Sequence, residues 1–239
     1  MAAALESVSK SPILSSALKS LFFAITVFFL RAGGQGFFSA AVFSSLFILF
    51  YFRPAIGSVK FLASASAVVL LTLKLPYSPA YEIYLSVFLG TLFYLLLGVK
   101  NLIHARRLHL YYLLHFGEVT GLSALAIKGI IHPFPAFLIF FFLFREFYLF
   151  SLNNVSSPKI WLAGGIEALT LNQALFVVSF LPLGSLLGGA LASTLVFVFH
   201  DLILRHSLGS LSREIILRNA TSAIFLTLLI FGTSTWTLS

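Results

Sequence analysis

Ionisable and amide side chains interrupt the apolar sequence at five places after Leu108. These are His115 and Glu118; Arg145 and Glu146; Glu167 with Asn172 and Gln173; His200 and Asp201; and Glu214, Arg218 and Asn219. A charge in the hydrocarbon core of a bilayer costs about 2.5–3.5 kcal/mol on insertion scales, so such residues need partners, water or a function. Carboxylates and histidines in this setting can hold protons, bind a cation or order water.

Two of these acidic residues have a basic partner on their own helix. Asp201 and Arg205 are spaced i,i+4, and Glu214 and Arg218 have the same spacing, with the acid on the favourable N-terminal side. Such pairs at helix ends are typical of a membrane surface. We therefore interpret both first as self-satisfied pairs.

The remaining charges do not balance. Three carboxylates face one permanent cation and two histidines that can change charge. They are Glu118, Glu146 and Glu167 against Arg145, with His115 and His200. Protons, a bound cation or water must neutralise the excess. We predict a substrate- or ion-binding cluster from these residues together with Asn172, Gln173, Asp201, Arg218 and Asn219. We assign no catalytic residue, no metal site and no cofactor.

Structural interpretations of the same residues stay open. Glu146 near a helix end could reach the interface beside Arg145, and His115 and Glu118, spaced i,i+3, could be a hydrogen-bonded packing pair. Asn and Gln side chains also join helices in lipid. The Gly164-Gly165 pair just ahead of Glu167 could open that helix for a ligand. Small residues at Gly184, Gly188, Gly189 and Ser193 predict close helix packing rather than chemistry.

The amino-acid composition indicates the environment of the segments that carry these residues. The chain has 239 residues, of which 59% are hydrophobic and 9% charged. Soluble domains carry about 25% charged residues, so the deficit and the mean hydropathy of +1.04 indicate a membrane protein. The net charge is +8, but no run of basic residues is longer than Arg106-Arg107. This argues against nucleic acid as a partner. The absence of cysteine excludes disulfides and thiolate chemistry.

Apolar stretches of 17 to 24 residues follow one another along the whole chain, and about 20 residues suffice to cross a bilayer. They are Pro12–Leu30, Gly36–Phe52, Val59–Leu75, Tyr81–Val99, Leu108–Ile131, Pro133–Phe150, Ile160–Leu181, Leu183–Leu204 and Glu214–Trp236. We predict an all-α, polytopic transmembrane bundle of about nine spans. The count falls to eight if the first stretch is a cleaved signal peptide, although Arg31 directly after it argues against cleavage.

The positive-inside rule orients these spans. With the N-terminus in the cytosol, twelve of the 15 Lys and Arg residues fall on the cytosolic side, and only Arg31, Lys74 and Lys128 on the other. The C-terminus is then outside, and the membrane is expected to be a plasma (inner) membrane. Counting about 1.5 Å per residue, the ionisable residues listed above all lie in the cytosolic half of their helices.

We expect one integral membrane domain over residues 1–239. Residues 12–107 carry few acids, with Glu82 at a polar helix end, and are expected to form an apolar scaffold. Residues 108–239 are expected to carry the buried polar layer.

Three kinds of function fit this pattern. The first is transport or binding of a small solute or ion through the polar cluster. The second is an intramembrane hydrolase, with a glutamate as base and a histidine as acid. The third is a non-catalytic scaffold that binds membrane lipid or other membrane proteins, with the polar layer joining helices. We place transport or binding first and leave open whether the protein is an enzyme.

One family offers a partial resemblance. The CAAX-type glutamic intramembrane proteases carry paired glutamates before an arginine, then Phe-x-x-x-His and His-x-x-x-Asn. Phe144-Arg145-Glu146 and Leu217-Arg218-Asn219 resemble this order in part, whereas the paired glutamates and both motif histidines are missing. A degenerate relative of that family is expected to have lost activity by its mechanism.

Overall fold

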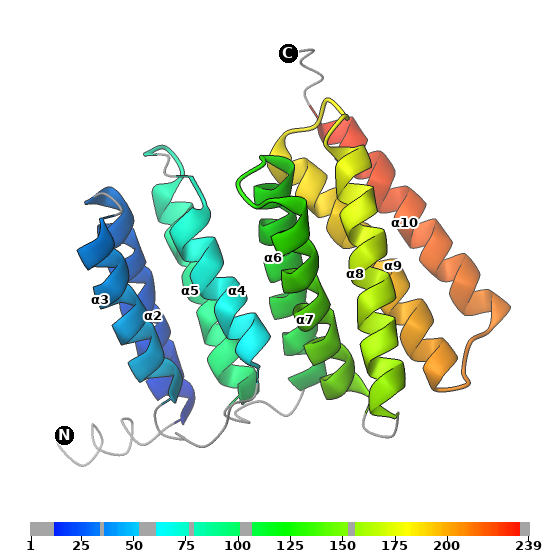
Figure 1. Cartoon of the computed structure of the whole chain (residues 1–239), viewed down its shortest axis with the longest axis horizontal. Helices are drawn as coiled ribbons and strands as arrows, with labels where there is room; N and C mark the ends of the chain where they lie inside the picture. The colour runs from blue at the N-terminus through cyan, green and yellow to red at the C-terminus, as the bar shows by residue number, and fades with distance from the viewer. Residues whose placement is uncertain are drawn as a thin grey trace. The chain divides into compact units, whose positions relative to one another are not determined.

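The computed structural model describes residues 12–33, 36–52, 61–76, 79–100, 107–152 and 156–234. The regular structure in these residues is entirely α-helical. It consists of α2 (Pro12–Ala32), α3 (Phe37–Phe52), α4 (Leu62–Lys74), α5 (Glu82–Lys100), α6 (Arg107–Ile127), α7 (Pro133–Ser151), α8 (Ser157–Val178), α9 (Ser185–Ser207) and α10 (Arg213–Thr233). Figure 1 shows these helices along the chain.

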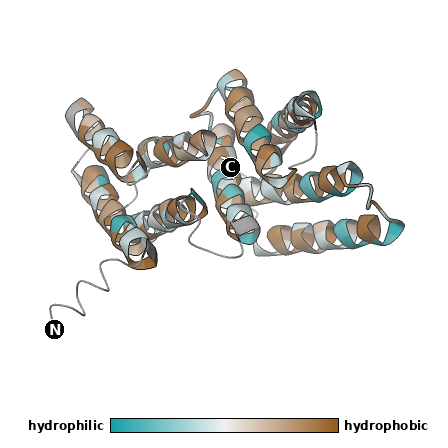
Figure 2. Cartoon of the chain, turned by 90° about the horizontal axis from the view of Figure 1, so that it is seen from below, coloured by the Kyte–Doolittle hydropathy of each residue, from teal (hydrophilic) through white to brown (hydrophobic). Residues whose placement is uncertain are grey.

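Seven of the described helices are long and apolar enough to cross a bilayer, namely α2 and α5 to α10. Their 19 to 23 residues correspond to about 28–35 Å, which matches a hydrocarbon core about 30 Å thick. The helices α3 and α4 have 16 and 13 residues and are shorter than this. The all-α prediction is thus confirmed, and the chain is an integral membrane protein with seven candidate spans. Apolar residues predominate along these helices (Figure 2).

A glycine follows the end of each of two helices, and one of them, α6, ends earlier than hydropathy alone predicts. The α6 stretch was expected to reach Ile131, but Gly129 adopts a φ of 70° directly after Lys128. The Ile130 amide then donates to the Leu125 carbonyl at 3.0 Å, in the pattern of a Schellman cap. Gly209, with a φ of 64°, ends α9 in the same way, although α9 continues to Ser207, past its predicted end at Leu204. The amides at and just after the left-handed glycine donate to the last carbonyls, so α6 stops inside its apolar stretch.

Contacts divide the chain into two compact units, residues Met1–Leu114 and His115–Ser239, and the division falls within α6. In the first unit α2 packs against α3 and α5, and α4 packs against α5. Phe23 and Phe93 stack with ring centroids 4.4 Å apart at the centre of an aromatic core. At the α2–α5 contact a Cβ on Gly90 would lie 2.8 Å from the Cβ of Ala24, so glycine permits this close approach.

A buried ion pair closes one end of the first unit. Arg31 uses all five N–H donors of its guanidinium. Two go to the Glu82 carboxylate and three to the carbonyls of Thr72, Leu75 and Pro76. The arginine thereby joins the end of α2 to the end of α4 and the start of α5. Glu82, expected at a polar helix end, is only 2% exposed.

We predict that Glu82→Gln destabilises the first unit by about 3–5 kcal/mol, because it leaves the Arg31 charge buried without its counterion. Equilibrium unfolding in mixed micelles measures the change. The double variant Arg31→Met, Glu82→Leu should recover part of the loss, since it removes both charges but leaves the carbonyls at and just after the end of α4 without their donor. Lys74→Met, at an exposed position in the last turn of α4, is the control and should leave stability unchanged. A Glu82→Gln variant as stable as wild type would contradict the buried ion pair.

Candidate functional site

A chain of four hydrogen-bonded side chains crosses the interior of the second unit. The Tyr148 hydroxyl donates to Glu167 Oε2 at 2.6 Å, and Glu167 Oε1 lies 2.5 Å from His200 Nδ1. His200 Nε2 lies 2.9 Å from His115 Nε2. We call these four residues the polar chain. It takes one side chain from each of α6, α7, α8 and α9, and no member is more than 1% exposed.

Aromatic rings enclose the two imidazoles of the polar chain. The Phe147 ring stacks on His200 with centroids 3.9 Å apart and lies 4.9 Å from His115. Phe144 meets His200 edge-on at 5.3 Å. This apolar surround strengthens the internal hydrogen bonds and makes any unpartnered polar group costly.

The hydrogen bonds of the polar chain constrain where its protons lie. The Nε2 atoms of His200 and His115 face each other, so one of them must carry the hydrogen and the other must accept it. If His200 is neutral and donates from Nδ1 to Glu167, its Nε2 accepts from His115. If His200 is protonated, it donates from both nitrogens and His115 accepts. The polar chain can therefore hold different numbers of protons without losing a hydrogen bond.

The four residues share one depth in the second unit. His115 and Glu167 lie eight and ten positions after the starts of α6 and α8, and Tyr148 and His200 lie three and seven positions before the ends of α7 and α9. At about 1.5 Å per residue, all are roughly 5–15 Å from the same end of these antiparallel helices.

Small residues bring α9 close enough to α6 for the two histidines to meet. A Cβ on Gly189 would lie 2.5 Å from the Thr120 carbonyl oxygen, closer than real Cβ contacts come. The hydroxyls of Ser193 and Thr120 are hydrogen-bonded at 2.6 Å. Gly189 and Ser193 thus serve helix packing, as their spacing predicts, whereas nothing lies within 4 Å of a Cβ on Gly184.

Glycine has the same role between α7 and α8. A Cβ on Gly164 would lie 3.1 Å from the Arg145 backbone nitrogen. The helix is continuous through Gly164 and Gly165 over Ser157–Val178, so this pair does not interrupt α8 in this structure. The close approach instead brings Glu167 to Tyr148.

A second polar group joins α9 to α10. Asp201 accepts a hydrogen bond from Asn219 Nδ2 at 2.8 Å and pairs with Arg205 at 3.3 Å and Arg218 at 3.8 Å. The predicted i,i+4 pair of Asp201 and Arg205 is confirmed. The arginine predicted to pair with Glu214 instead reaches Asp201 on the neighbouring helix.

The other predicted site residues take part in none of the hydrogen bonds and ion pairs named above. The Arg145 guanidinium lies over the Trp161 ring, 4.2 Å from its centroid, in a cation–π contact. Glu118 is fully buried one turn from His115, whereas Glu146 and Asn172 are half-buried and Gln173 is exposed. Of the eleven predicted residues, the structure therefore brings His115, Glu167 and His200 into one group and Asp201, Arg218 and Asn219 into another.

Sequence reasoning missed Tyr148, the one member of the polar chain without a formal charge. Its signal was present, since Phe144, Phe147 and Tyr148 are spaced i, i+3 and i+4 and share a face of α7. A buried tyrosine hydroxyl needs a partner, and a carboxylate on the adjacent helix supplies it.

No protein-family model, no curated protein and no solved structure matches this chain. Among the residues that the structure describes, no three His, Asp or Glu side chains are grouped as a metal site requires. A proposal for the function therefore has to be based on the chemistry of the polar chain.

We predict that Gly189→Ala separates α9 from α6, because its new methyl group meets backbone rather than a movable side chain. The expected loss is about 1–3 kcal/mol in equilibrium unfolding. Gly188→Ala is the matched control, since its Cβ would meet the side-chain tips of Ile127 and Val178, at 2.8 and 3.1 Å, which can rotate away. Equal losses in the two variants would contradict a specific α6–α9 contact.

Proposed function

We propose that this integral membrane protein transports or binds a small solute or ion, and that its polar chain takes up and releases protons during the cycle. The observation that carries the proposal is the unbroken hydrogen-bonded sequence Tyr148–Glu167–His200–His115, three of whose members can change protonation state. Ionisable residues inside a membrane protein typically mark ion pathways and proton relays.

The geometry supports a definite movement of charge. A proton taken up by His200 is stabilised by the adjacent Glu167 carboxylate. Transfer of the hydrogen from His200 Nε2 to His115 Nε2, across 2.9 Å, moves the positive charge from α9 to α6. Transfer from Nδ1 to Glu167 instead neutralises the pair. Since a charge in an apolar interior is costly, each of these states favours a different helix arrangement, and this links proton binding to conformational change.

A second candidate function is a non-catalytic scaffold. It is favoured because two sets of polar side chains join neighbouring helices by internal hydrogen bonds. These are the polar chain and the Asp201 group, which consists of Asp201, Arg205, Arg218 and Asn219. The two candidates differ in whether the charge of Glu167 has to change.

We predict that Glu167→Gln abolishes solute-coupled or ion-coupled proton movement while the protein still folds, because the amide keeps a hydrogen-bonding side chain but cannot exchange the proton. Purified protein in liposomes loaded with a pH-sensitive dye, under an imposed potential or pH gradient, measures the flux. Glu214→Gln, at an exposed position of α10, is the matched control and should keep the wild-type rate.

The scaffold candidate makes the opposite prediction. Wild-type liposomes would then show no flux above protein-free liposomes, and Glu167→Gln would cause only a loss of stability. A Glu167→Gln variant that conducts protons at the wild-type rate would also refute the proton role.

The proposal includes a topology. We place the N-terminus in the cytosol of a plasma or inner membrane, the C-terminus outside, and all nine helices across the bilayer, with α3 and α4 as the two short crossings. Residues 12–107 serve as the apolar scaffold and 108–239 as the working part of one membrane domain. The Lys and Arg residues support this orientation, because twelve of the 15 fall on the cytosolic side.

The cysteine-free sequence allows a direct topology test with single cysteines. We predict that Ser210→Cys is labelled by an impermeant maleimide only from the cytosolic side and Ser179→Cys only from outside, since both positions are exposed between helices. Position 58 lies between α3 and α4 in the sequence, and Ser58→Cys should be labelled from the cytosolic side, as Ser210→Cys is. Labelling of Ser58→Cys from the outside would reduce the count to seven spans, and inversion of Ser210→Cys and Ser179→Cys would overturn the orientation.

A further inference from the structure

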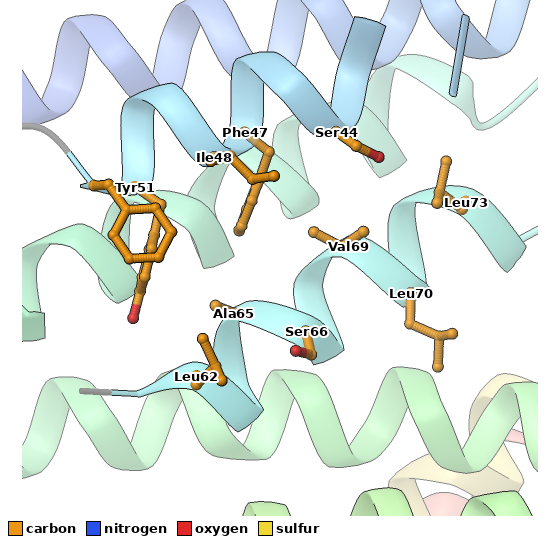
Figure 3. A pocket seen from close by; sticks show the side chains of 11 residues that line it. Ser44, Phe47, Ile48, Tyr51, Leu62, Ala65, Ser66, Val69, Leu70 and Leu73 are labelled. Carbon is orange, nitrogen blue, oxygen red and sulfur yellow. The ribbon is translucent and has the colours of Figure 1, made fainter. Parts of the chain in front are cut away.

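The first unit contains an apolar groove between α3 and α4. Its volume is about 310 Å³, at the lower end of the range for ligand pockets. Figure 3 shows its walls, with Tyr51 and Leu62 towards one end and Ser44 and Leu73 towards the other. Ile48, Val69 and Leu70 also line it. In a bilayer the liquid that reaches such a groove is the hydrocarbon of lipid chains, so its apolar walls suit an acyl chain.

A buried cation lies beside one end of this groove. Lys100, only 7% exposed, places its ammonium 3.8 Å from the Tyr51 ring centroid and 5.3 Å from that of Phe52. It donates one hydrogen bond to the Tyr51 carbonyl. Both aromatic residues line the groove, so the positive charge and the apolar walls adjoin.

The described residues of the first unit do not neutralise this charge. Their one carboxylate, Glu82, pairs with Arg31. Glu82 and Lys100 are the first and last residues of α5, about 27 Å apart along the helix. Lys19 adds a second positive charge within electrostatic reach of Lys100. An ammonium has three donors, and only one is used by Tyr51.

We propose that this groove binds an anionic phospholipid, with one acyl chain between α3 and α4 and the phosphate at the Lys100 ammonium. Basic pockets between membrane helices select anionic headgroups by the same electrostatics. The site lies within the first unit and does not depend on the function proposed for the polar chain.

The test is native mass spectrometry of the full chain released from nanodiscs that contain equal amounts of phosphatidylglycerol and phosphatidylcholine. Wild-type protein should retain phosphatidylglycerol with about fivefold preference, the ratio expected for one lysine at an anionic headgroup. Lys100→Met should remove the preference, whereas Lys100→Arg should keep it. Lys128→Met, at an exposed position after α6, is the control for general loss of positive charge.

A second variant tests the acyl-chain part of the site. Val69→Phe places extra volume in the groove and should lower the number of retained lipids of both kinds. Val87→Phe, on the exposed surface of α5, is its matched control and should leave that number unchanged. The proposal is overturned if Lys100→Met keeps the wild-type preference, if the wild type prefers neither lipid, or if Val69→Phe retains as many lipids as Val87→Phe. A second copy of the chain in place of retained lipid would overturn it as well.

Discussion

The structure depends on one constraint: a polar group buried in hydrocarbon must find its partner inside the protein. The two units meet this constraint differently. Arg31 is permanently charged and uses all of its donors on one carboxylate and three carbonyls. The polar chain consists of tyrosine, glutamate and two histidines, and it satisfies its hydrogen bonds with more than one arrangement of protons. The first solution suits a fixed joint, and the second suits a site whose charge changes.

Close helix contacts make both solutions possible. Lipid supplies no hydrophobic drive for helix association, so backbones must approach closely enough for packing and hydrogen bonds to act. Gly90 allows this between α2 and α5, and Gly164 allows it between α7 and α8. Gly189 has the same role between α9 and α6, where the Cβ of any other residue would meet the Thr120 carbonyl. The separation of the two imidazoles therefore depends on Gly189, about three helical turns from His200, as well as on the histidines themselves.

The sequence predicted depth well and partners less well. Rise per residue gives the level of a side chain along its helix, so His115, Glu167 and His200 could be assigned to one layer without knowledge of the fold. Rotation about the helix and the choice of neighbour depend on tertiary packing, which one sequence does not contain. Arg145 was therefore assigned to carboxylates but lies over Trp161, and Arg218 was assigned to Glu214 but reaches Asp201. Tyr148 could be recognised as buried from its spacing, but its partner and the Arg31–Glu82 pair could not be predicted because the partners lie on other helices. The sequence counted α3 as a span, but its 16 residues are fewer than the roughly 20 that a bilayer crossing needs.

Helix α9 contributes residues to both polar groups of the second unit. Gly189, Ser193 and His200 lie within about 40° of one another around a helix of 3.6 residues per turn, and they face α6 and α8. Asp201 follows His200 directly and is therefore rotated by about 100°, which directs it to Asn219 on α10. A rotation of α9 large enough to break the His200 contacts would also displace Asp201 from Asn219 and Arg218. The Asp201 group thus holds α9 at the rotation that the polar chain requires, although it exchanges no hydrogen bond with that chain. Two polar groups with different partners thereby occupy consecutive residues of one helix.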